Sequence, residues 1–165
     1  MNKKVIAIIS WVIVVWSSYV FLSSLPFKFT GHPATQHIFG TIGTWLSGFL
    51  GTGIGNLFSN LGGYLVGSFE LLTALVLLSP AFYWLRNKAG GTKSYSRAKI
   101  HQYGGLMAAA VMAGAAFFHI FTPLGIEVVR DGVGDGGSLF KTAISVLVGG
   151  LLLFFLNRSI TKSNS

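Results

Sequence analysis

Glu70 is the residue that points most directly to chemistry, because it interrupts an uncharged and apolar run over residues 63–85. An acidic side chain within such a run costs several kcal/mol to place in lipid, so it normally faces a partner, water or the interior of a helical bundle. Gly67 and Ala74 share its helical face, where small side chains allow close contact with a neighbouring helix. The pattern predicts an inward-facing carboxylate with three open interpretations: one half of a bundle-locking ion pair, a ligand-binding or proton-transferring group, or a contact with another subunit.

Three further ionisable residues are expected at the depth of Glu70, one on each of three other apolar segments. His119 lies near the end of the third segment, Lys141 in the first turn of the fourth, and Lys28 just beyond the first. Together the four would form a ligand-binding or buried polar cluster, in which Glu70 and His119 could hydrogen-bond a carbonyl or relay protons. Each also has an ordinary explanation, since a histidine at a helix end commonly makes packing hydrogen bonds and an interfacial lysine reaches for headgroups.

A metal or haem site is not expected, although the sequence contains four histidines. His101 is expected in the inner loop, and His119 would lie about 27 Å further along a continuous helix, so they cannot share a haem. His32 and His37 could approach His119, but no metal-binding spacing such as HExxH is present. The absence of cysteine excludes disulfides, thiolate zinc sites, iron–sulfur clusters and dithiol exchange. A redox role would therefore need a bound cofactor, for which a quinone is the candidate.

The composition indicates an integral membrane protein. The 165 residues are 52% hydrophobic and only 10% charged, whereas a soluble domain has roughly 25% charged residues. Four crossings of about 20 residues each would nearly fill the chain and leave no room for a separate soluble catalytic domain. The excess of 12 basic over 4 acidic residues fits cytoplasmic membrane loops better than a nucleic-acid surface, so no nucleic-acid partner is expected.

Four apolar runs are long enough to cross a bilayer, at residues 5–25, 63–85, 106–124 and 139–156. The first is expected to be a retained anchor, because a signal-peptide core has roughly 7 to 15 apolar residues and ends in a small-residue cleavage site. The polar stretch 86–103 is predicted to be a loop.

Residues 38–61 are ambiguous, because they carry no charge and place apolar side chains at helical spacing among Gly, Ser, Thr and Asn. Such a stretch fits an amphipathic interfacial helix, a re-entrant helix or a fifth span packed through small residues. The charge distribution favours four spans, because a fifth would move the basic stretch 86–99 outside. With four spans and a cytoplasmic N-terminus, the inner side holds Lys3, Lys4, the basic residues of 86–99, Arg158 and Lys162, against Lys28, Arg130 and Lys141 outside.

The expected fold class is therefore all-α: one integral membrane domain over residues 1–165, a four-helix bundle with an extra amphipathic or re-entrant segment at 38–61. We expect it in a bacterial-type cytoplasmic membrane, with both termini in the cytoplasm.

Several motifs resemble those of the DoxX-like family of small four-span membrane proteins. They are Leu25-Pro26-Phe27-Lys28-Phe29-Thr30-Gly31, Gly67-Ser68-Phe69-Glu70-Leu71-Leu72 with Pro80, Met112-Ala113-Gly114-Ala115-Ala116-Phe117-Phe118-His119, and Gly136-Gly137-Ser138-Leu139-Phe140. The resemblance covers roughly residues 5–158. It implies a four-helix membrane fold in a family where some members are linked to thiosulfate oxidation with quinone and many have no established activity. This cysteine-free chain cannot follow relatives that depend on thiol exchange.

Three functions are compatible with these features. The leading one is a non-catalytic accessory subunit that presents small-residue helix faces to another membrane protein or to a second copy of itself. The alternative is a redox subunit that binds a quinone or another small molecule. A proton-coupled carrier that uses Glu70 is the least favoured, because the spans hold one acid and no inverted repeat is evident.

Overall fold

The computed structural model describes residues 2–91 and 96–162, and this part of the chain is almost entirely helical. Its elements are α1 (Lys3–Phe29), α2 (Pro33–Leu50), α3 (Thr52–Lys88), α4 (Arg97–Phe121), β1 (Val129–Arg130), β2 (Val133–Gly134) and α5 (Ser138–Lys162). The two short strands form one antiparallel hairpin between α4 and α5. The all-α prediction is confirmed.

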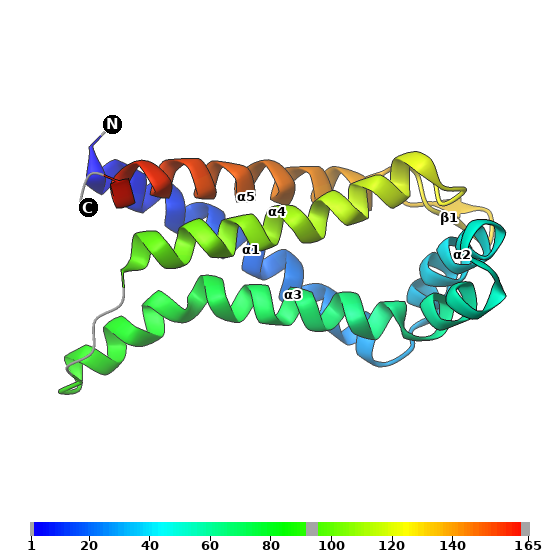
Figure 1. Ribbon diagram of the computed structural model, residues 1–165, viewed down its shortest axis with the longest axis horizontal. Coiled ribbons are helices and arrows are strands. Elements are labelled where there is room, and N and C mark those ends of the chain that lie inside the picture. The colour runs from blue at the N-terminus through cyan, green and yellow to red at the C-terminus, as the bar shows by residue number, and fades with distance from the viewer. Residues whose placement is uncertain (1, 92–95, 163–165) are drawn as a thin grey trace.

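Four of the helices, α1, α3, α4 and α5, are long and apolar enough to cross a membrane. They run along the length of the molecule in Figure 1, and both chain ends lie at the same end of the bundle. We call this end, where α3 also finishes and α4 begins, the terminal end. The opposite end carries α2 and the β1–β2 hairpin, and we call it the hairpin end (Figure 1).

The interior of the bundle is packed with apolar side chains from all four long helices. Val14, Phe21, Leu77, Val146 and Leu153 are fully buried in one cluster. Large apolar side chains also cover the outer faces of the same helices, where no other part of the protein shields them. A surface with so much exposed apolar area is suited to contact with lipid.

Helices α4 and α5 approach each other closely through paired glycines. A Cβ atom on Gly105 would lie 2.7 Å from the carbonyl oxygen of Gly150, and a Cβ on Gly150 would lie 2.6 Å from the carbonyl oxygen of Gly105. Buried Asn157 of α5 also donates to Ser10 Oγ of α1 at 3.0 Å. Small residues therefore set the helix spacing, as is common in membrane bundles.

The expected segment 38–61 is divided between two helices. Gly51 has φ +84°, a backbone conformation that glycine adopts readily, and it separates α2 from α3. The two helices pack against each other at Gly43 and Gly55, where an added Cβ would overlap the partner backbone. Residues 52–61 are thus the start of α3 and not part of a separate amphipathic segment.

The helices extend beyond the apolar runs that mark them in the sequence, except that α4 ends at Phe121 and not at position 124. Helix α3 has 37 residues, so it begins at Thr52 rather than at position 63 and is about 55 Å long. The expected loop 86–103 is shorter, because α3 continues to Lys88 and α4 begins at Arg97. Lys93, counted among the basic residues of that loop, lies outside the described residues. Hydropathy identifies only the apolar middle of a helix, and polar residues that continue the helix on either side are missed.

Candidate functional site

Lys28 and Glu70 form a buried ion pair between α1 and α3. The Nζ atom of Lys28 donates to Glu70 Oε2 at 2.7 Å, and Ser24 Oγ donates to the same oxygen at 2.6 Å. Glu70 is only 4% exposed. Its carboxylate is therefore neutralised within the chain, which is one of the three interpretations that the sequence allowed.

The pair depends on a close approach of the two helices at Gly67. Lys28 lies in the last turn of α1, and its side chain passes along α3 so that a Cβ on Gly67 would be 3.3 Å from Lys28 Cβ and Cδ. Gly67 lies about one helical turn before Glu70. The missing side chain at this position gives the lysine a path to the carboxylate.

A cavity of about 410 Å³ lies beside Lys28, between the end of α1, helix α2 and the first half of α3. Polar side chains form much of its wall, including those of Gln36, Ser59 and Asn60. Lys28 thus lines the cavity while its ammonium group also contacts buried Glu70. The arrangement offers hydrogen-bond donors to a small ligand with carbonyl or anionic oxygens.

His119 and Lys141, the other two residues of the expected cluster, make their hydrogen bonds in the connection between α4 and α5. His119 is buried, and its Nδ1 donates to the carbonyl oxygen of Gly125 at 2.7 Å. Lys141 is exposed, and its Nζ donates to the carbonyl oxygen of Gly136 at 2.8 Å. These hydrogen bonds do not reach Lys28 or Glu70, so contact is established for two of the four residues and the wider cluster stays a prediction.

Asp135 organises the connection that His119 and Lys141 contact. Its Oδ1 accepts from the backbone N–H groups of Val128 and Gly137 at 2.8 and 2.9 Å, and its Oδ2 accepts from that of Leu139 at 2.9 Å. Burial acts to raise the pKa of Asp135, but these donors, helped by the Ser138 hydroxyl, outweigh it and lower the pKa below its usual range. The hairpin and the start of α5 are thus tied to one ionised carboxylate.

A second polar group, at the terminal end, was missed by the sequence reasoning, which placed His101 in a loop. His101 lies near the start of α4, is fully buried, and meets the ring of Trp11 edge-on with 4.9 Å between ring centroids. Arg97 Nη1 donates to His101 Nδ1 at 3.3 Å. The N-cap Ser96 and the i, i+4 spacing of Arg97 and His101 are the signals that could have extended the helix this far.

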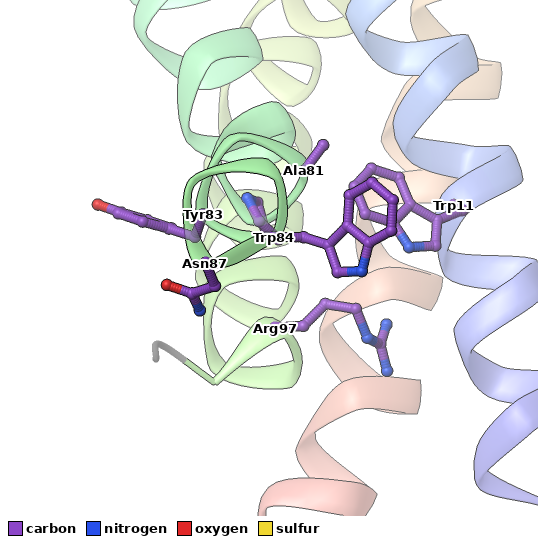
Figure 2. Close-up of a pocket in the computed structure, with 7 residues that line it drawn as sticks. Trp11, Ala81, Tyr83, Trp84, Asn87 and Arg97 are labelled. Atoms are coloured by element: carbon purple, nitrogen blue, oxygen red, sulfur yellow. The ribbon is translucent and has the colours of Figure 1, made fainter. Parts of the chain in front are cut away.

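Trp11 and Arg97 also line a cavity of about 460 Å³ at this end of the bundle (Figure 2).

Within residues 2–91 and 96–162, no three side chains of the metal-ligating types gather into a group that could hold a metal ion. Comparisons of the chain with protein-family profiles, with curated proteins and with solved structures found no match.

Proposed function

We propose that this chain is an integral membrane protein of DoxX-like type, and that it acts as a non-catalytic accessory subunit that binds another membrane protein. The exposed face of α4 supports this role best. It presents Tyr103, Leu106, Ala110, Ala113, Phe117 and Phe121 at spacings of three and four residues, and we call this set the α4 stripe. Small residues in its middle allow a partner helix to approach closely, and large apolar residues on either side extend the contact.

The state of Glu70 also favours an accessory role over a carrier role. Glu70 is the one acidic residue within the four candidate spans, and it is held by Lys28 and Ser24. A carrier would need this carboxylate to gain and lose a proton, or to exchange partners, during transport. Its pairing is better suited to locking α1 against α3.

The proposed location is a bacterial-type cytoplasmic membrane with both termini in the cytoplasm. The termini and the α3–α4 connection share the terminal end (Figure 1), where Lys88 and Arg97 lie. Three of the four acidic residues, Glu127, Asp131 and Asp135, lie at the hairpin end. This distribution fits the positive-inside rule.

Cross-linking from the α4 stripe tests the accessory role. A photoreactive residue placed at Tyr103 should capture one defined membrane protein, or a second copy of this chain, before extraction from native membranes. Ala113→Leu should abolish that product, because a large side chain prevents close helix contact. Ser68→Leu is the matched control, since Ser68 is an exposed small residue on α3 outside the stripe. A chain that is never cross-linked and is always isolated alone would refute the proposal.

Binding of a quinone or another small molecule is the second candidate, and the cavity beside Lys28 favours it. Lys28, Gln36 and Asn60 line this cavity and can donate hydrogen bonds to carbonyl oxygens. Solvent extraction of the purified protein should then release a stoichiometric ligand. The double variant Gln36→Leu/Asn60→Leu should lose it while Lys28 and Glu70 remain paired. A wild-type protein that retains no ligand in several mild detergents would exclude this function.

A further inference from the structure

The cavity at the terminal end combines aromatic walls with one permanent positive charge. It lies between α1, α3 and α4, and Trp11, Trp84 and Arg97 each line it. Figure 2 shows the two indole rings near each other, with the side chain of Arg97 extending below them. Pro80 and Ala81 add apolar surface from α3. A ligand that fits this wall must have both an apolar and an anionic part.

Pro80 accounts for the space at this end. A proline inside a helix has no N–H group for the carbonyl four residues earlier and its ring crowds that carbonyl, so helices bend there. In Figure 1 the last turns of α3, beyond Pro80, run away from α4. The divergence leaves room between α3 and its neighbours that side-chain packing would otherwise fill.

The orientation of Arg97 is fixed by uncharged groups. Within the described residues, its guanidinium donates one hydrogen bond, to Nδ1 of His101, and the ring of His101 packs in turn perpendicular to the ring of Trp11. An imidazole nitrogen that accepts this hydrogen bond orients the guanidinium but does not neutralise it. As far as the described part of the chain shows, most of the five N–H donors of Arg97 therefore stay available to a ligand.

No acidic side chain of this chain is placed to neutralise Arg97. The sequence contains four acidic residues, at Glu70, Glu127, Asp131 and Asp135. Glu70 is paired with Lys28, and the other three lie between α4 and α5 at the hairpin end. Further cations at the terminal end, Arg86, Lys88 and Lys99, increase the positive potential there. Within the described residues Arg97 thus has no acidic side chain as a counter-ion, so an anionic ligand can take that place.

We propose that this cavity binds the phosphate headgroup of an anionic phospholipid. A guanidinium binds phosphate oxygens through paired, charge-assisted hydrogen bonds. Indole rings favour the boundary between headgroups and acyl chains, where the ends of the spans would lie. The phosphate contacts Arg97, and the first part of an acyl chain lies along Trp11 and Trp84. The inference rests on the membrane insertion proposed above.

Titration with defined lipids tests this site. The full chain is purified in detergent with phosphatidylcholine, phosphatidylglycerol is added, and retained lipid is counted by native mass spectrometry. We expect saturable binding of phosphatidylglycerol, weakened about tenfold or more in Arg97→Gln by the loss of charge-assisted hydrogen bonds. Arg158→Gln is the matched control, because Arg158 lies over the ring of Phe154 on α5 and does not line the cavity. If Arg97→Gln fails to fold, Arg97→Lys should fold and bind more weakly than wild type, since it keeps the charge but not the planar fork.

Four results would overturn the proposal. The first is that phosphatidylcholine binds as well as phosphatidylglycerol, and the second is that both Arg97 variants bind phosphatidylglycerol as wild type does. The third is that Arg158→Gln weakens binding as much as Arg97→Gln. The fourth is that inorganic phosphate at equal concentration displaces the lipid, which would assign the site to a soluble phosphate. Flotation with phosphatidylcholine vesicles distinguishes a failure of the lipid site from a failure of the membrane proposal. A chain that floats but shows no preference for phosphatidylglycerol refutes the lipid site alone.

Discussion

The Lys28–Glu70 pair illustrates why a charged side chain is stable in the protein interior only when its oppositely charged partner is also present. Each ion alone would have a large desolvation cost in the bundle interior, and their attraction offsets it together with the hydrogen bond from Ser24. The pair joins α1 to α3, so its loss acts on the packing of two spans. Substitution of either partner therefore tests directly whether Glu70 is ionised.

Glu70→Gln should lower the free energy of unfolding by about 2–4 kcal/mol, because it leaves the Lys28 ammonium without a counter-charge. The lower part of this range applies if Lys28, whose side chain is 16% exposed, turns toward the adjacent cavity. Thermal or denaturant unfolding in detergent measures the change. Lys28→Met in the Glu70→Gln background should restore part of the loss, since no unpaired charge remains. A Glu70→Gln protein as stable as wild type would instead show that the carboxyl group is already protonated.

Asp135 predicts a pH dependence at the hairpin end. Because folding lowers its pKa, the folded protein holds this proton less tightly than the unfolded chain, where the pKa is about 4. The stabilisation is complete above the unfolded value and is lost as pH falls through the folded value. The difference in melting temperature between wild type and Asp135→Ala should be largest near neutral pH and should close in acid. Asp131→Asn, which removes a nearby carboxylate that is 89% exposed and pairs only at the surface with Arg130, should follow wild type at every pH.

At the scale of helices, the sequence predicted which segments are helical better than where they end. Apolar runs revealed the four long helices, because lipid-exposed and buried faces are both apolar and leave no polar stripe. The same measure missed the first turns of α3, where Gly, Ser and Asn continue the helix, and the first turns of α4 around His101. Charge alone made Lys28 one possible partner of Glu70 but did not distinguish it from Lys141 or His119. The terminal-end cavity could not be expected, since it depends on how α3 bends beyond Pro80.

Glycine contacts between α4 and α5 should be more sensitive to substitution than open glycines on the same helix. Gly105→Ala places a Cβ 2.6 Å from Leu153 Cβ, so the helices must separate, and a loss of about 1–3 kcal/mol is expected. Gly114→Ala meets no atom within 4 Å and should be neutral or stabilising by up to about 1 kcal/mol through helix propensity. Unfolding of the two variants in one detergent checks the contrast. Equal effects would mean that α4 and α5 do not pack through Gly105.

At the scale of the whole molecule, the two ends of the bundle differ in charge and structure. Basic side chains gather at the terminal end, where none of the four acidic side chains lies, whereas three acidic side chains lie at the hairpin end together with α2 and the β1–β2 hairpin (Figure 1). If all four candidate helices cross the membrane, as we propose, both termini and the α3–α4 connection lie on one side of it. Because basic loops are retained in the cytoplasm, this asymmetry supports the direction of insertion that we propose.

Reporter insertions at three turns therefore give a defined topology. A reporter after Gly90, between α3 and α4, should lie in the cytoplasm, and one after Gly132, between the two strands, should lie outside. The third, after Gly51, decides the place of α2, which is about 27 Å long and could nearly span a bilayer. Within the described residues α2 is not among the helices apolar enough to cross, so this reporter should also lie outside. A cytoplasmic reporter at Gly51 would make α2 a fifth span and would place the Lys28–Glu70 pair and its cavity elsewhere in the membrane. The reverse result at Gly90 and Gly132 would show that the cations at the terminal end do not set the orientation.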